Sequence, residues 1–151
     1  MKIKFEYFTR IPIFILLCIP VFLVAQSGRE GNHCAVKKSP YRVSMDSGKV
    51  VYKKQCLSCH QEDGLGVSDV NPPLNVKVVT GDKTKLIGII ISGQNTHEEL
   101  NGKTYQNTMP ANPDIKDHEI ADVLTYIRNS FGNKASAVKE SEVKLTRSKL
   151  K

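Results

Sequence analysis

The sequence predicts a small all-α domain. Its 151 residues are enough for one domain, and apolar residues make up 40% and charged residues 25% of the chain, which is ordinary for a globular protein. Two segments, at about 46–58 and 116–131, repeat apolar or small residues at the spacing of a helix face. The chain has neither an internal repeat nor a run of about 18–20 apolar residues. These observations exclude a solenoid, a multi-pass membrane protein and a large multidomain enzyme.

The first 25 residues have the pattern of a secretory signal. Lys2, Lys4 and Arg10 precede a mostly apolar stretch over 11–24, and Ala25 is a small residue at the expected cleavage point. An uncleaved segment that anchors the chain to a membrane is the alternative. We therefore expect residues 1–25 to direct export to the periplasm or another extracytoplasmic compartment, and residues 26–44 to form a flexible arm.

The net charge of +7 belongs to the two flanks of the chain. Basic residues are in excess over 26–44 and 134–151, whereas acidic residues outnumber basic ones over 45–133. A nucleic-acid-binding domain needs a basic stripe with interleaved aromatic side chains on a folded face, so we expect no nucleic-acid partner. Residues 134–151 have no firm period and no aromatic residue. They predict a disordered basic tail, or a short arm that folds against an acidic partner or a membrane surface.

The first predicted helix covers about 46–58. Gly48, Tyr52 and Cys56 are spaced four residues apart, which places them along one face of that helix. Because Gly48 has no side chain, another helix can cross this face closely.

The motif that carries chemistry is Cys56-Leu57-Ser58-Cys59-His60. Cys-x-x-Cys-His is the pattern of c-type haem attachment. On a helix, residues three and four apart are neighbours, so both thiols and the imidazole can face one flat ligand. Each thiol can then add to a haem vinyl group while the imidazole binds the iron.

Three other interpretations use the same residues. A thioredoxin-like redox pair normally lies at a strand-to-helix turn, whereas residues 44–55 have a helical period. A zinc site needs two more ligands at short spacing, and only His33 and Cys34 lie near. A disulfide between Cys56 and Cys59 is the third. Cys34 is the thiol left over once a haem takes two, and its role stays open.

Two further helices are expected towards the C-terminus. The apolar run Leu86–Ile91 ends at Gly93 and predicts a short buried helix, although its β-branched residues also allow a strand. The segment 116–131 is the clearest helix of the chain, with Asp117 as its N-cap and Gly132 as its C-cap. Its apolar positions follow the i, i+3, i+4, i+7 pattern: Ile120, Val123, Leu124, Ile127 and Phe131.

Met109 is the predicted second iron ligand. It lies within 102–110, where Gly, Asn and Pro predict a loop. A thioether on a loop can approach the open face of the iron, and Met with His is the axial pair of electron-transfer cytochromes. The other candidates are less suitable. Met45 lies near the start of the first helix, whereas His97 and His118 fall in polar, solvated segments.

Taken together, the chain resembles a class I, monohaem cytochrome c over about 44–133. It is similar to the small cytochrome domains that accompany cbb-type oxidases and periplasmic dehydrogenases. The resemblance rests on Gly48…Tyr52…Cys56-x-x-Cys59-His60, Pro72-Pro73-Leu74, Gly102…Tyr105…Met109-Pro110 and the run 119–133. It implies a small cytochrome c fold over 45–133, whose first and last helices cross near Gly48, Tyr52 and Tyr126 while loops and short helices enclose the haem.

The resemblance also implies a site and a role. One covalent haem c with its iron would be held, and the Pro72 carbonyl would accept a hydrogen bond from the His60 imidazole. Phe131 stands where relatives often have Trp. With both axial positions filled, the implied role is electron transfer and not catalysis. The chain would be a soluble carrier or the electron-carrying subunit of a respiratory oxidoreductase complex.

The implied redox partners are a dehydrogenase or a terminal oxidase. Two alternative functions remain at this point. One is a peroxidase or gas sensor in which Met109 is displaceable. The other is an exported helical domain with a structural disulfide and no haem.

Overall fold

The computed structural model describes residues 37–95, 99–100 and 102–150. The predicted signal segment 1–25, the 26–36 part of the predicted arm, and the candidate residues His33, Cys34 and His97 lie outside the described residues. Within those ranges the regular structure is helical, with isolated β-bridges only, which confirms the all-α prediction. The helices are α1 (Pro40–Gln55), α2 (Leu57–His60), α3 (Lys77–Thr80), α4 (Lys83–Ser92), α5 (Asp117–Ile127) and α6 (Glu140–Lys149). No helix found there has the length and apolar character to cross a membrane.

Helix α1 begins earlier than predicted. Pro40 occupies its first position, and the Ser39 hydroxyl accepts a hydrogen bond from the Arg42 N–H at 3.3 Å. Both features favour a helix start, so the helix includes the end of the predicted flexible arm. The predicted single helix over 46–58 is also two helices, because the backbone breaks at Cys56 before α2 begins.

Helix α4 is helical rather than extended, and longer than the predicted Leu86–Ile91. The Asp82 carboxylate accepts a hydrogen bond from the Thr84 N–H at 2.8 Å, which caps the helix one turn before the apolar run. Gly93 closes the helix with a φ of 77°, as the sequence predicts, since glycine adopts this conformation readily.

Helix α5 differs from its prediction at both ends. Lys116 is the N-cap in place of Asp117, and its N–H donates to the Glu119 carboxylate at 3.1 Å. The helix ends at Ile127, four residues before Phe131. Phe131 has a φ of 56°, which no right-handed helix contains. Gly132 therefore belongs to the following turn and is not the C-cap.

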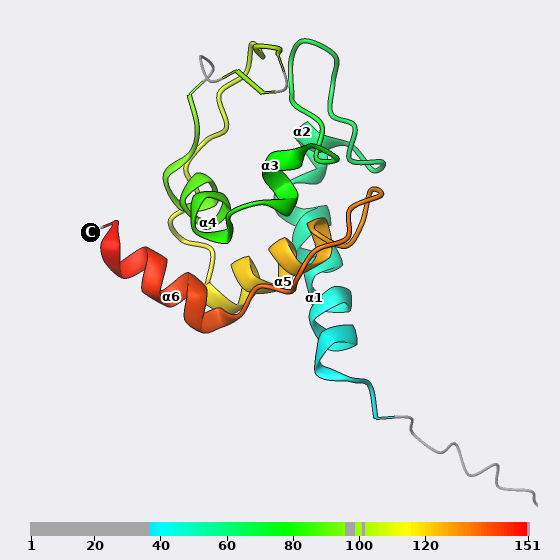
Figure 1. The fold of residues 1–151 in the computed structure, drawn as a ribbon, viewed down its shortest axis with the longest axis vertical. Helices are drawn as coiled ribbons and strands as arrows, with labels where there is room; N and C mark the ends of the chain where they lie inside the picture. The colour runs from blue at the N-terminus through cyan, green and yellow to red at the C-terminus, as the bar shows by residue number, and fades with distance from the viewer. Residues whose placement is uncertain (1–36, 96–98, 101, 151) are drawn as a thin grey trace, which may run out of the picture. The chain divides into compact units, whose positions relative to one another are not determined.

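The crossing of α1 and α5 is the most extensive contact between helices in the described part of the chain (Figure 1). A Cβ atom on Gly48 would lie 2.1 Å from the Asp122 carbonyl oxygen and 2.8 Å from the Tyr126 Cβ. One turn further along α1, the Tyr52 ring lies 5.5 Å from the Tyr126 ring and 5.3 Å from the Phe131 ring. These contacts confirm the predicted crossing near Gly48, Tyr52 and Tyr126.

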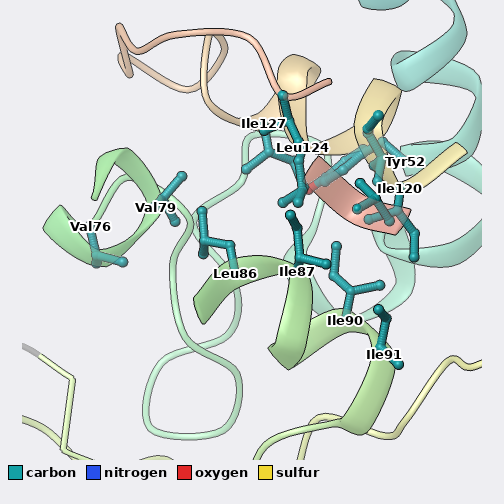
Figure 2. Packing of buried hydrophobic residues seen from close by; sticks show 14 residues of the cluster. Tyr52, Val76, Val79, Leu86, Ile87, Ile90, Ile91, Ile120, Leu124 and Ile127 are labelled. Atoms are coloured by element: carbon teal, nitrogen blue, oxygen red, sulfur yellow. The ribbon is translucent and has the colours of Figure 1, made fainter. Parts of the chain in front are cut away.

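The apolar core lies between α4 and α5, as Figure 2 shows. Ile87 of α4 and Ile120 of α5 are fully buried, and both point into the cluster that the two helices share. Val76 and Val79 extend this cluster towards α3. The core therefore fixes α3 and α4, whose residues also line the site described below.

The C-terminal segment is folded, which corrects the prediction of a disordered tail. Residues 140–149 form α6, which packs against α4 and α5. Val143 is fully buried, and two ion pairs hold the helix: Lys83–Glu142 at 3.0 Å and Arg147–Asp117 at 2.7 Å. The segment buries few apolar residues, so its sequence has no clear period. Its partners are charged groups distant in the sequence, which composition alone does not indicate.

The crossing at Gly48 generates a stability prediction. Gly48→Ala places a methyl group against the backbone of α5, which cannot move without separating the helices, so we expect a loss of about 3 kcal/mol in unfolding free energy. Gly88→Ala in α4 is the matched control, because nothing lies within 4 Å of its added Cβ; we expect a gain of about 0.5–1 kcal/mol. Urea titrations followed by far-UV circular dichroism measure both. Equal effects of the two variants would contradict the assignment of a close crossing.

The docking of α6 generates a pH prediction. Burial acts to raise the pKa of Glu142, but the Lys139 N–H and the Lys83 ammonium outweigh it and lower the pKa below the ordinary 4.5. A lowered pKa stabilises the fold above pH 4.5, and the contribution is lost as pH falls through the folded-state value. Glu142→Gln should therefore destabilise the protein at neutral pH, with a difference from wild type that shrinks in acid.

The control is Glu140→Gln, at an exposed position in the same turn of α6. It should change stability by less than about 0.5 kcal/mol. Urea titrations at a series of pH values provide the measurement. A Glu142→Gln difference that stays constant from neutral to acid pH would show that the ion pair does not hold α6.

Candidate functional site

One apolar pocket beside the core is lined by all the predicted site residues. It encloses about 1090 Å³ of space free of protein atoms, part of it open to solvent. Cys56, Cys59, His60, Pro72 and Met109 line it. The remaining lining is mainly aliphatic and includes Val76, Val79, Leu86, Ile90, Leu124 and Ile127.

The two thiols lie where α1 gives way to α2. Cys56 is the break residue and is partly buried, whereas Cys59 is exposed on α2. Burial, followed by the influence of the Cys59 thiol, raises the pKa of Cys56 to about 11. Both side chains are free thiols, so the two groups are available on one edge of the pocket.

The imidazole of His60 is oriented by a backbone carbonyl. Its Nδ1 lies 3.0 Å from the Pro72 carbonyl oxygen. Because a carbonyl can only accept, Nδ1 must carry the proton, and the neutral ring then has an unprotonated Nε2. Burial lowers the pKa of His60, although the bond to Pro72 opposes that effect, so the neutral ring is favoured. A neutral imidazole with a fixed tautomer is what a metal ligand requires.

The chain after His60 is held by the aromatic cluster of the helix crossing. The Tyr52 hydroxyl donates to the Gln61 carbonyl at 2.6 Å, and burial raises the pKa of Tyr52, which keeps the hydroxyl protonated. A Cβ on Gly64 would lie 2.4 Å from the Phe131 ring. The loop is therefore packed against the α1–α5 junction, which fixes the end of α2.

Met109 lies on a loop whose backbone is bonded on two sides. It forms an antiparallel bridge with Gln94, with N···O distances of 2.9 and 3.0 Å. Two residues earlier, the Asn107 N–H donates to the Val70 carbonyl at 3.0 Å. The first contact ties the methionine to the end of α4, and the second ties its loop to the loop that follows α2.

Several positioning residues could not be found from the sequence. The bridge between Gln94 and Met109 is formed by backbone atoms, so no pattern of side chains predicts it. Asn133 belongs to the run that carries the resemblance, but its contacts are visible only in the structure: its side-chain amide donates to the Leu74 carbonyl at 2.8 Å and to the Ile127 carbonyl at 3.0 Å. It thereby links the end of the predicted domain to the pocket wall.

The donor set fits a covalently attached, planar iron cofactor. Two thiols three residues apart, an imidazole with an available Nε2, and a thioether share one pocket that is otherwise apolar. Cys56 and Cys59 could attach the cofactor, and His60 and Met109 could bind its iron. The zinc interpretation is weaker, since no group of three His, Cys, Asp or Glu side chains suited to a metal occurs in the described part of the chain.

Comparisons with known proteins agree with this geometry. The family model for cytochrome c matches residues 45–131, which is more than half of the chain. Among curated proteins, the chain is 38% identical over 91 residues to the cytochrome c subunit of quinone alcohol dehydrogenase from Gluconacetobacter polyoxogenes. It is 33% identical over 84 residues to cytochrome c-552 from Thermus thermophilus. It is 35% identical over 95 residues to the gluconate 2-dehydrogenase cytochrome c subunit from Pantoea cypripedii.

The extent of these matches differs between relatives. The match covers 58% of this chain but 19% of the alcohol dehydrogenase subunit, and 60% of this chain but 21% of the gluconate dehydrogenase subunit. For the Thermus cytochrome the values are 52% and 64%. The similarity therefore covers about a fifth of each dehydrogenase subunit and about two thirds of the Thermus cytochrome.

The support of α2 generates a prediction. Tyr52→Phe removes the hydroxyl that donates to the Gln61 carbonyl and leaves that acceptor with only the long bond from the Gly64 N–H at 3.4 Å, so we expect a loss of about 1–2 kcal/mol in unfolding free energy. Tyr41→Phe, at an exposed position near the start of α1, is the control and should change stability by less than about 0.5 kcal/mol. Chemical denaturation followed by circular dichroism distinguishes them. If Tyr52→Phe were as stable as Tyr41→Phe, the bond would not support the loop.

Proposed function

This chain belongs to the cytochrome c family and carries covalent haem c, and from that premise we propose that it transfers single electrons between protein partners through a His60- and Met109-ligated iron. The observation that carries the proposal is the presence of two thiols, one oriented imidazole and one thioether around the same apolar pocket. When bound, haem supplies one-electron chemistry by cycling between Fe(II) and Fe(III).

Cys56 and Cys59 would hold the cofactor. Each S–H would add across one vinyl group, forming a C–S bond with no leaving group. Cys56 is partly buried and Cys59 is exposed, so the attachment points are at the mouth of the pocket rather than deep in the core. Covalent attachment suits a small domain, whose limited core could not retain a large cofactor by burial alone.

His60 and Met109 bind the iron. The Pro72 carbonyl fixes the His60 ring and, by accepting its Nδ1 proton, makes Nε2 a stronger donor. The Met109 thioether favours the reduced iron and so raises the reduction potential. The aliphatic lining of the pocket acts in the same direction, since an apolar surrounding disfavours the more highly charged oxidised state.

With His60 and Met109 both holding the iron, no ligand position would be left for a substrate. The proposed role is therefore outer-sphere electron transfer, and the chain is an electron carrier rather than an enzyme. Partners would dock over the exposed edge of the pocket near Cys59. Redox partners of this kind form small interfaces and separate quickly.

We propose a dehydrogenase as the electron donor. Support comes from the similarity to cytochrome subunits of quinone alcohol, gluconate and fructose dehydrogenases. A terminal oxidase is the proposed acceptor, which would place the protein in a respiratory chain. The chain matches about a fifth of those subunits, so it would act either as a free carrier or as one redox domain of a complex. We propose no nucleic-acid partner, because the basic excess lies outside 45–133.

The proposed location is the periplasm or another extracytoplasmic compartment. Support comes from the basic residues of 1–10, the apolar stretch 11–24 and Ala25, which together have the pattern of an export signal. If this segment is not removed, it would hold the domain at the membrane surface.

Replacing the proposed thioether ligand tests the assignment. In Met109→Ala we expect the weak far-red band of the iron–sulfur bond to disappear, the reduction potential to fall, and carbon monoxide to bind the reduced protein stoichiometrically. Met45→Ala in α1 is the matched control. It should retain the wild-type spectrum and reduction potential, and its reduced form should not bind carbon monoxide. Optical spectra of both redox states and a potentiometric titration provide the measurements.

Two results would contradict the proposal. Prompt carbon monoxide binding by the reduced wild-type protein at neutral pH would favour a sensor or peroxidase with a displaceable Met109. A colourless protein, or a negative pyridine haemochrome assay after expression with the haem-ligation machinery, would indicate that Cys56 and Cys59 form a structural disulfide instead.

A further inference from the structure

Helix α6 lies outside the residues that the family model matches, 45–131. None of the steps proposed above requires it. It nevertheless packs against α4 and α5, as Figure 1 shows. It also forms two ion pairs, Lys83–Glu142 and Arg147–Asp117, with segments that adjoin the Met109 loop.

The first contact holds the chain downstream of Met109. Arg147 of α6 donates from Nε to the Asp117 carboxylate at 2.7 Å, from Nη1 to the Pro113 carbonyl at 2.7 Å, and from Nη2 to the Ile115 carbonyl at 2.6 Å. Pro113 and Ile115 lie in the short connection from the Met109 loop to α5, and Asp117 is the first residue of α5. The planar guanidinium fixes them together, because its donors have a rigid geometry.

The second contact holds the chain upstream of Met109. Lys83, the first residue of α4, donates to the Ala137 carbonyl at 2.7 Å and to both Glu142 carboxylate oxygens at 3.0 and 3.1 Å. Helix α4 then carries this constraint to the loop. At its other end, the Asn112 N–H donates to the Ile90 carbonyl at 3.0 Å, and Gln94 forms the bridge to Met109.

We propose that α6 is a brace for the Met109 loop, with Arg147 as a positioning residue that sets how firmly the thioether stays on the iron. The proposal rests on Met109 being the ligand. The loop has no regular secondary structure of its own, so its resistance to local opening depends on the contacts at its two ends. Because α6 bonds to the segments on both sides, releasing it makes opening of the loop more frequent.

The experiment measures transient loss of the methionine directly. Imidazole binding to the oxidised holoprotein and carbon monoxide binding to the reduced holoprotein both require Met109 to leave the iron. In Arg147→Gln we expect both binding rates to rise roughly tenfold or more, since three charge-assisted hydrogen bonds are lost. Arg147→Lys keeps the positive charge but loses the planar set of guanidinium donors. Its ligand-binding rates should therefore fall between those of wild type and Arg147→Gln.

Two controls separate positioning from general destabilisation. Lys144→Gln makes the same charge change at an exposed position of α6 and should leave the rates at the wild-type value. Ser44→Ala removes a hydrogen bond from α1 to the Asp122 carboxylate of α5, which weakens the fold away from the loop. It should lower the urea midpoint without raising the ligand-binding rates. Lys83→Gln tests the second contact of the brace if Arg147→Gln does not fold.

The outcomes distinguish this proposal from the one on which it rests. A wild-type protein that lacks the far-red iron–sulfur band overturns ligation by Met109, and with it the brace. A wild-type protein that shows the band, together with binding rates in Arg147→Gln and Lys83→Gln no higher than in Ser44→Ala, overturns the brace alone. Faster binding in both brace variants, with unchanged rates in the two controls, supports it.

Discussion

The close crossing of α1 and α5 is the contact on which the rest of this structure depends. Gly48 lets the two backbones approach to a separation that no side chain would permit. That approach brings Tyr52 against Tyr126 and Phe131, and the Tyr52 hydroxyl then fixes the carbonyl of the residue after His60. The position of the thiols and the imidazole thus depends on a glycine that lies eight to twelve residues earlier in the chain.

The two proposed iron ligands are supported in different ways. His60 belongs to a short helix that continues from α1, and its ring is fixed by the Pro72 carbonyl. Met109 lies on an irregular loop that is held by backbone bonds to Gln94, Asp69 and Val70. A ligand on such a loop is released by local opening at lower cost than one on a packed helix. Contacts that restrain the loop therefore have direct consequences for the chemistry of the site.

Basic residues of this protein also hold distant segments of the chain together. Arg128 is 2% exposed and donates to the carbonyls of Val79, Gly81 and Ser136, which joins α3 to the start of the C-terminal segment. Lys83 and Arg147 use the same chemistry at α6. When such a cation is removed, the carbonyls that it binds lose their hydrogen-bond donor. These residues therefore connect distant segments without a large apolar surface.

The sequence by itself determined the helical class, the attachment motif, the loop that carries Met109 and the apolar face of α5, because each depends on neighbours within a few residues. The tertiary structure alone decided where α5 ends, since Phe131 leaves the helix and packs against the Tyr52 ring. The start of α1 is a local signal, the Ser39 cap and Pro40, which the apolar spacing did not include. The tertiary structure also decided that residues 140–149 fold, because their partners, Lys83 and Asp117, are distant in the chain. Spacing along a sequence reports local geometry, whereas ion pairs and backbone bridges between remote segments leave no pattern to read.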